Sequence, residues 1–324
     1  MAIARTWRTS QRPEGPFQAR VEDIPGLNHV FSDSFTERYR RDGLVGVRVP
    51  FLNPTIWRYA IEDADGGALL WRNEREEIVA FNIVHCSGRE GWMGPLAVRP
   101  EAQGIGVGKE IVRAGIAWLE GANASTIGLE TMPRTMDNIG FYSALGFVPG
   151  RLTVTVTLDA AHGEHPPMLY GRLSARDKRD VLGECRALLG TLLDGYDFSR
   201  EITLTDELGL GDTVLFREAG RLTGYALCHT APLVEGRARE ETRVLKLVVA
   251  RQTDFAAAVL GLADFARRNG TRRVAFRAQT EYLDAYRTLI TLGGRVRWTD
   301  LRMTLDAYPE PAAHGSVVWS NWEI

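Results

Sequence analysis

Cysteine is scarce in this chain of 324 residues. The three cysteines, Cys86, Cys185 and Cys228, are too few and too scattered for a disulfide framework or a zinc site. No apolar run approaches the roughly 18 residues that a membrane span requires. The N-terminus also lacks the apolar core and the cleavage site of a signal peptide. We therefore expect a cytoplasmic protein that uses neither a metal nor a membrane.

An excess of charge of one sign is also absent. Lys and Arg total 39 against 41 for Asp and Glu, which gives a formal net charge of −2. This balance provides no basic surface for nucleic acid. Lysine occurs only at Lys109, Lys178 and Lys246, and this preference for arginine is typical of a GC-rich bacterial genome. With 44% apolar residues, a chain of this length is expected to form two folded domains.

The second half of the sequence repeats the first. The runs 67–72 and 78–85 alternate as a β-hairpin does, and 212–217 with 222–229 parallels them. A short apolar run before a helical stretch also occurs in both halves, at 96–98 and at 247–249. Thr-Leu-Asp-Ala then ends each half, at 157–160 and 304–307. Four matched pieces in one order favour a tandem duplication over two unrelated α+β domains.

The repeat predicts the domain organisation. We expect a first domain at 1–160, a linker at 161–168, a second domain at 169–310 and a tail at 311–324. Each half reads as helices, a β-meander, a helix, a strand, a helix and a last strand. In the first half these are a helix with Ile111, Ala114, Gly115 and Trp118 on one face, a strand at 126–131, a helix at 137–145 and a last strand at 152–159 that closes its sheet.

A glycine-rich turn joins a strand to a helix in the first half. Gly104, Gly106 and Gly108 follow the apolar run, and the helix begins at once. Glycines let backbone N–H groups approach an anion, and a helix N-terminus adds free donors and a favourable dipole. Lys109 adds a positive charge. The spacing fits neither a Walker A loop nor a dinucleotide fingerprint, yet it predicts a phosphate site rather than a flexible or packing turn.

Two motifs resemble those of the GCN5-related N-acetyltransferases (GNATs). Gln103, Gly106 and Gly108 form the Q-x-x-G-x-G signature that binds pyrophosphate in that family, and 138–147, NIGFYSALGF, is similar to its C-terminal helix motif. The resemblance covers residues 17–160 well and 169–307 in outline. It implies an α/β (α+β) architecture of tandem GNAT folds. Each fold would have a mixed, mostly antiparallel sheet, flanking helices and a fourth strand that bulges at Pro95 and splays from the fifth.

The resemblance also implies acetyl-CoA as acyl donor and no metal. Tyr142 would protonate the leaving thiolate, a role that suits a neutral phenol. The family often has Asn seven positions before this Tyr, where this chain has Thr135, and Asn138 is the alternative ligand. The positions that match the family's acetyl-CoA site are Leu96, Ala97, Val98, Gln103, Gly104, Ile105, Gly106, Val107, Gly108, Lys109, Asn138 and Tyr142.

The implied reaction is direct attack on the thioester by a primary amine of a small molecule or peptide, in a ternary complex. Glu130 is the first candidate for the general base, with equal weight given to a surface carboxylate there, and Glu90 is the second candidate. Asp33 and Glu37 share one helix face and would attract a cationic amine, although a solvated face explains them as well.

Two further features bear on the acceptor side. His85 and His229 occupy matching positions in the two halves, which predicts a structural role for both. The tail, with Trp319 and Trp322, either adds a strand to the sheet or covers the acceptor site.

The second half lacks the residues of the signature. Side chains replace the glycines, and Asp254, as a helix cap, would repel an anion. We expect this half to keep the fold without binding the cofactor. The counterparts of Gln103, Gly106, Gly108 and Tyr142 are Asp254, Ala257, Val259 and Leu289.

Two other functions stay open. One is a non-catalytic acyl-CoA-binding or interaction module. The other is an amine acetyltransferase like mycothiol synthase, a tandem GNAT whose competent half is C-terminal, whereas the intact motif here is N-terminal. A homodimer also stays open.

Overall fold

The computed structural model describes residues 12–163 and 166–322. In this part of the chain, a thirteen-stranded sheet runs through both halves in the order β1-β2-β3-β4-β5-β12-β6-β11-β10-β9-β8-β7, and β13 pairs with β10. The strands are β1 (Glu14–Gln18), β2 (Ala68–Arg72), β3 (Ile78–Ser87), β4 (Glu90–Val98), β5 (Thr126–Thr131), β6 (Phe147–Asp159), β7 (Met168–Leu169), β8 (Gly211–Glu218), β9 (Arg221–His229), β10 (Glu241–Val249), β11 (Arg273–Gln279), β12 (Arg295–Leu305) and β13 (Val317–Ser320).

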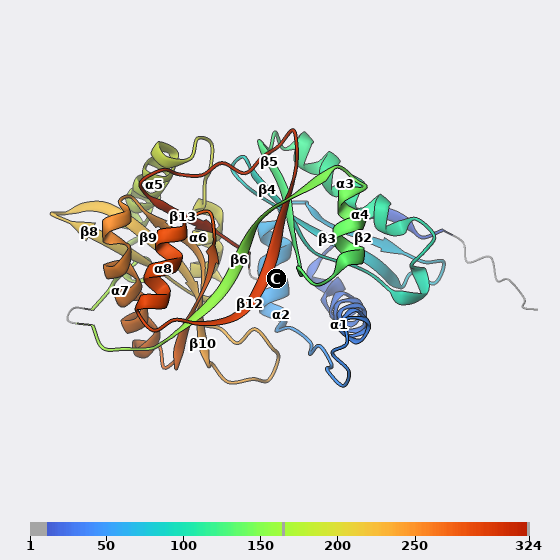
Figure 1. The fold of residues 1–324 in the computed structure, drawn as a ribbon, viewed down its shortest axis with the longest axis horizontal. Coiled ribbons are helices and arrows are strands. Elements are labelled where there is room, and N and C mark those ends of the chain that lie inside the picture. Colours follow the sequence, from blue (N-terminus) through green and yellow to red (C-terminus); the bar gives the residue numbers. More distant parts are fainter. Residues whose placement is uncertain (1–11, 164–165, 323–324) are drawn as a thin grey trace, which may run out of the picture.

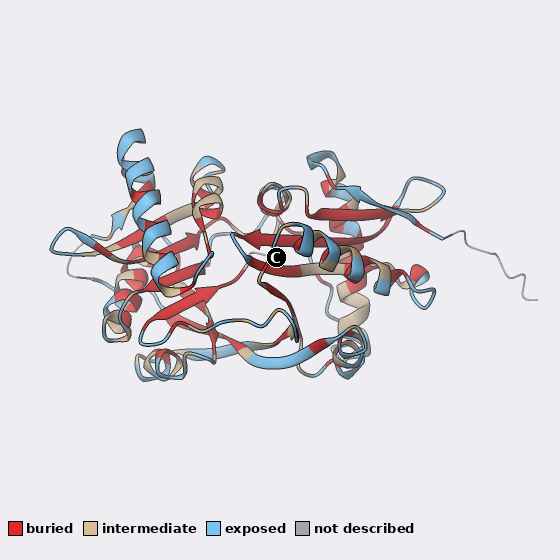
Figure 2. Ribbon diagram, turned by 90° about the horizontal axis from the view of Figure 1, so that it is seen from above, coloured by how far each residue is buried: buried red, intermediate tan, exposed pale blue. Residues whose placement is uncertain are grey.

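Helices cover both faces of the sheet (Figure 1). Their outward sides are exposed, whereas the strands are mostly buried (Figure 2). The helices are α1 (Ile24–Arg41), α2 (Pro54–Asp63), α3 (Val107–Gly121), α4 (Met136–Ser143), α5 (Ala175–Leu192), α6 (Ser199–Glu207), α7 (Phe255–Arg268) and α8 (Leu283–Thr291). No helix among the described residues is long and apolar enough to cross a membrane.

The predicted repeat of the meander is confirmed. In the first half β2, β3 and β4 are antiparallel neighbours and β4 runs parallel to β5. In the second half β8, β9 and β10 repeat the antiparallel order, and β10 runs parallel to β11. The helix α3 packs on the first meander through the predicted face. At Gly115 a Cβ atom would lie 2.5 Å from Met93 Sδ, so a larger residue there would have to displace the Met93 side chain.

The last strands of the two repeats are exchanged. The expectation that 152–159 closes the first sheet is wrong about its neighbours, because β6 pairs with β12 on one side and with β11 on the other. It is β12, from the second repeat, that pairs with β5. In Figure 1 the two strands lie side by side between the halves. Alternation of apolar residues predicts a strand, but backbone hydrogen bonds do not specify which strand is its partner.

The fourth strand of each repeat separates from the fifth. In the first half, β4 pairs with β5 only from Glu90 to Met93, although β4 continues along β3 to Val98. In the second half, β10 pairs with β11 only from Glu241 to Val244. There, the C-terminal strand β13 occupies the vacated edge of β10, from Lys246 to Val249. The tail therefore adds a strand, which is one of the two predicted outcomes.

Candidate functional site

A cavity of about 720 Å³ opens where β4 leaves β5. Its walls come from α1, from β4 and from α4, and the second half of the chain contributes to them as well. The lining residues from that half are Leu233, Arg277, Trp298, Asp300 and Trp322. The site is thus built by both repeats, and the exchange of β12 brings two of these residues to it.

The glycine-rich turn presents backbone donors at one end of this cavity. The amides of residues 104–108 form no hydrogen bond with any described residue, and α3 begins at Val107. Gly104 and Gly106 have φ values of +83° and +94°, which side chains rarely adopt, and a Cβ at either position would meet nothing within 4 Å. The glycines are therefore needed for backbone conformation and not for packing. An anion could reach these amides freely.

Gln103 fastens this turn to the sheet. Its Nε2 donates to the carbonyl of Val98 at 2.9 Å, while its Oε1 accepts from Arg41 at 3.2 Å. Among the predicted ligands, Leu96, Ala97, Val98, Gln103, Gly108, Asn138 and Tyr142 line the cavity. Gly104, Ile105, Gly106, Val107 and Lys109 lie just beyond its wall, at the start of α3, and the Lys109 side chain is exposed without an ion pair to any described residue.

Tyr142 lies on α4 with its ring packed against Phe141 and Phe147. Burial raises the pKa of Tyr142 above its usual value, so the phenol stays protonated at neutral pH. Its hydroxyl forms no hydrogen bond with a described residue and is therefore available to a ligand in the cavity. Thr135 Oγ1 instead donates to Asp42 at 2.9 Å, so the position where the family often has Asn here joins α4 to the end of α1.

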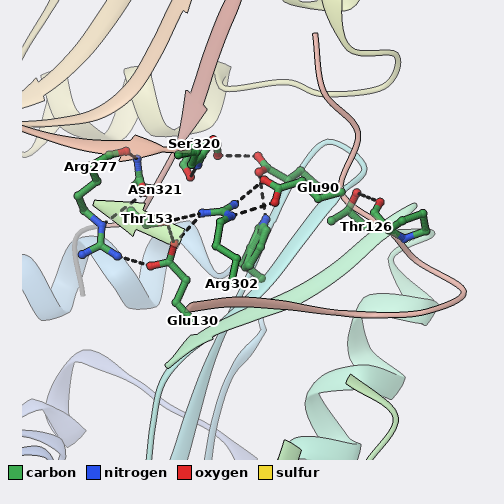
Figure 3. A network of polar contacts seen from close by, with 12 residues as sticks. Glu90, Thr126, Glu130, Thr153, Arg277, Arg302, Ser320 and Asn321 are labelled. Carbon is green, nitrogen blue, oxygen red and sulfur yellow. Dashed lines mark hydrogen bonds and ion pairs between the residues drawn. The ribbon is translucent and has the colours of Figure 1, made fainter. Parts of the chain in front are cut away.

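Glu130 is held by two arginines from the second repeat and by Thr153 of its own repeat (Figure 3). It accepts from Arg277, from Arg302 Nη1 at 2.7 Å and from the Thr153 hydroxyl. Burial acts to raise the pKa of Glu130, but the two arginines outweigh it and the pKa is lowered. A carboxylate so engaged is a weak proton acceptor, which argues against the predicted role as general base. Arg302 also lies 3.8 Å above the centre of the Trp92 ring.

The other predicted carboxylates are engaged as well. Glu90 is buried outside the cavity lining and accepts from Trp92 Nε1 and Ser320 Oγ. Asp33 also lies outside the lining and pairs with Arg48 at 2.7 Å. Glu37 lines the cavity, but hydrogen bonds from Arg40 and Arg41 lower its pKa to about 2. Their charges are already compensated, which weakens the case that they attract a cationic amine.

In the second half, buried side chains stand at positions that correspond to the signature. Val259 and Leu289, the counterparts of Gly108 and Tyr142, are fully buried in the core. Asp254 stands at the N-cap position of α7 but makes no capping bond, and its carboxylate instead pairs with Arg251 at 2.8 Å. The expectation that Asp254 fills the helix terminus is therefore wrong. The edge of β10 that is left where β10 separates from β11 is occupied by β13.

Two sets of cavity residues were missed from the sequence. The first set comes from β11 and β12, and no sequence signal marks it, because it depends on the strand exchange. The second is His85, which lines the cavity and whose Nδ1 lies 2.9 Å from Asp63 Oδ2. Its match with His229 in the second repeat had predicted a structural role for His85. The described residues contain no group of three or more His, Cys, Asp or Glu that could hold a metal ion.

A splayed parallel strand pair, a glycine-rich helix start and a tyrosine facing the opening together define an acetyltransferase-type fold. Comparison with known families supports this class: residues 29–147 match the model of the Acetyltransferase (GNAT) family. The match covers less than half of the chain and shows that this part is similar to that family. No match was found among curated proteins.

Solved structures extend the likeness to the whole length. A protein of Pyrococcus horikoshii assigned as an acetyltransferase superposes with a TM-score of 0.69 at 16% identity, over 96% of this chain and 95% of that chain. A GCN5-related N-acetyltransferase from Sphaerobacter thermophilus gives 0.57 at 14%, over 92% and 97%. A tandem GNAT protein from the clavulanic acid biosynthesis pathway gives 0.56 at 12%, over 92% and 98%. These likenesses show the fold, and the chain has a tandem GNAT architecture.

Proposed function

We propose that the protein transfers an acetyl group from acetyl-CoA to a primary amine of a small molecule or peptide. The observation that carries this proposal is the cavity itself. The edge of β4 between Gly94 and Val98, the start of α3 and Tyr142 border one space, which is where a thioester, its pyrophosphate and its leaving group would need to lie. The side of this cavity formed by α1 is left for the acceptor.

The residues have separable roles in this proposal. The amides of residues 104–108 bind pyrophosphate, and Gln103 fixes their position against β4. The free edge of β4 at Leu96, Ala97 and Val98 hydrogen-bonds the pantetheine arm, as a neighbouring strand would. Holding the thioester beside an amine removes most of the entropic barrier to reaction. Tyr142 then gives its proton to the thiolate as the carbon–sulfur bond breaks.

We further propose that the second repeat binds no cofactor and serves the acceptor side. In support, β13 occupies the edge of β10 that matches the free edge of β4. Residues 169–310 also supply Arg277, Trp298 and Asp300 to the cavity wall. The boundaries 1–160, 161–168, 169–310 and 311–324 then describe the repeats of the sequence, while the functional site draws on both.

Calorimetric titration with acetyl-CoA tests the site. We expect one site per chain, abolished by Gly106→Glu because the new side chain would enter the space where the pyrophosphate is bound. Ala257→Glu is the matched control, since Ala257 is the exposed counterpart in the second repeat and the same change there should leave binding intact. Two sites per chain, or equal loss in both variants, would contradict the proposal.

Turnover separates an enzyme from a binding module. Coenzyme A release from acetyl-CoA is measured against a panel of primary amines, with Tyr142→Phe beside the wild type. We expect amine-dependent release, lowered about 100-fold in the variant while acetyl-CoA binding is kept. Tight binding with no release for any amine would favour the non-catalytic acyl-CoA-binding module instead.

A further inference from the structure

His85, which lines the cavity, forms a buried pair with Asp63. His85 lies on β3 directly opposite Trp92 of β4. Trp92 comes two residues before the point at which β4 separates from β5. Its exposed fraction is 2% and that of Asp63, at the end of α2, is 3%. The imidazole Nδ1 is 2.9 Å from Asp63 Oδ2. Because a carboxylate only accepts, Nδ1 carries the hydrogen and the lone pair of the neutral ring is on Nε2.

The Nε2 atom of His85 is buried and has no hydrogen-bond partner among the described residues. A buried nitrogen without a partner is costly, and such groups are retained where a ligand completes them. His85 is among the residues that line the cavity, so a molecule bound there is the candidate partner for Nε2. Trp322 stacks on the ring, with centroids 5.7 Å apart, and thereby fixes its plane.

The counterpart in the second repeat behaves differently. His229 Nε2 lies 2.9 Å from the Thr205 hydroxyl, and the residue is fully buried in the core. The shared sequence position therefore reflects a shared place on the third strand of each repeat. In the first repeat the imidazole lines the cavity, and in the second His229 is not among that cavity's lining residues.

The charged groups around the pair come from several elements. Arg200 of α6 donates to the carbonyl of Asp63 at 2.6 Å, and Glu201 of the same helix faces Asp63 and accepts from Ser87. The Nζ atom of Lys246, on β10, lies 3.9 Å from the centre of the Trp322 ring. The same Nζ atom lies 3.6 Å from Glu201 Oε1. Glu90 of β4 lies beyond Trp92. Among these groups, Asp63 alone hydrogen-bonds the imidazole.

We propose that His85 is the general base for the acceptor amine and that Asp63 is its positioning residue. This inference rests on the acetyl transfer proposed above. Nε2 takes one proton from the incoming ammonium group, which leaves a neutral amine to attack the thioester carbon. The nitrogen–carbon bond forms, the carbon–sulfur bond breaks, and the thiolate takes its proton from Tyr142. The second proton of the former ammonium restores Tyr142, and the imidazolium releases its proton to solvent.

The test compares His85→Gln, Asp63→Asn and the matched control His229→Gln. Acetyl-CoA binding is measured by calorimetry, and kcat/KM for an amine found by the panel is measured from pH 5 to 9. For wild type we expect a limb in which kcat/KM rises with pH, as a reaction that needs an unprotonated base requires. In His85→Gln that limb should vanish and kcat should fall about 100-fold, with acetyl-CoA binding unchanged. Asp63→Asn should displace the limb, and His229→Gln should keep it.

The outcomes separate the two proposals. If wild type acetylates amines and His85→Gln keeps both the rate and the pH limb, the base assignment is overturned while the acetyl transfer stands. If no amine is acetylated by wild type, the acetyl transfer fails and the base assignment fails with it. If His85→Gln loses acetyl-CoA binding together with activity, the residue is structural and the assignment is also overturned.

Discussion

Glu130 is a residue whose surroundings decide its role. It joins β5 of the first repeat to Arg277 on β11 and Arg302 on β12, and Arg302 in turn reaches Glu310 at 2.6 Å. The arginines lower the pKa of Glu130 in the folded protein, so its carboxylate contributes stability above the ordinary value of 4.5. That contribution is lost as the pH falls through the folded pKa.

We expect Glu130→Gln to lower the free energy of unfolding by roughly 3 kcal/mol at pH 7, because the buried Arg302 and the partly exposed Arg277 both lose a compensating charge. The difference from wild type should narrow as the pH is lowered from 7 towards 3, where wild type itself becomes protonated. Urea unfolding at several pH values measures this. Glu62→Gln, in an exposed pair with Arg58, is the control and should cost under about 1 kcal/mol. A difference that is constant with pH would contradict the assignment.

Residues that act through local sequence could be predicted, and residues that act through tertiary contacts could not. The glycine turn, Gln103 and Tyr142 lie where their motifs predict, because a strand, a turn and a helix start are set within a few positions. The partners of Glu130 and the free Nε2 of His85 depend on which strands become neighbours. No spacing in the sequence encodes that information.

At the scale of elements, the two splays have different occupants. The free edge of β4 borders the cavity, whereas the edge of β10 is covered by β13. Val317, Val318 and Trp319 of that strand are nearly fully buried. The same tail continues to Trp322, which lines the cavity of the first repeat. One segment thus covers the open edge of β10 and forms part of the cavity wall in the first repeat.

A chain that ends at Gly315 should unfold at a lower temperature, because about 1.5–3 kcal/mol is lost for each large apolar side chain of β13 that is no longer buried. It should still bind one acetyl-CoA, since Val259 and Leu289 fill the second site. Scanning calorimetry measures the unfolding temperature, and titration calorimetry measures the number of acetyl-CoA sites. Trp322→Ala keeps β13 and should mainly lower amine turnover. Binding of a second acetyl-CoA by the shortened chain would show instead that β13 alone excludes it.

The meanders, and the separation of the fourth strand from the fifth in each repeat, could be predicted because each repeat encodes them locally. The strand at 126–131 is found as expected, and the helix expected at 137–145 is α4 (Met136–Ser143). The occupant of the second splay could not be chosen from the sequence, since a short apolar tail with two tryptophans suits a strand or a lid equally well. Only the open edge of β10, a tertiary feature, decides between them.

For the molecule as a whole, the exchange of β6 and β12 makes one continuous sheet from two repeats (Figure 1). The first repeat alone would leave β5 without its neighbour β12, and the second alone would leave β11 without β6. We therefore expect that neither repeat folds by itself. A duplicated sequence predicts two independent domains. The repeat does not predict that the two halves exchange their last strands.

We expect a single cooperative unfolding transition in calorimetry. If a protease site is inserted within 161–167 and the purified protein is cleaved there, the two fragments should still elute together in gel filtration and part only in denaturant. Residues 1–160 expressed alone should fail to fold. Fragments that separate under native conditions, or two resolved transitions in the intact chain, would show that the halves are independent.

The strand exchange also sets the order of events on the ribosome. Residues Leu301 to Thr304, which cover the open edge of β5, are translated only after nearly the whole second repeat. Until then, the nascent first repeat presents an uncovered edge, a template for pairing with other chains. Closing such distant contacts is also slow. The chain should thus depend on chaperones or low temperature during synthesis more than an isolated single-repeat acetyltransferase does.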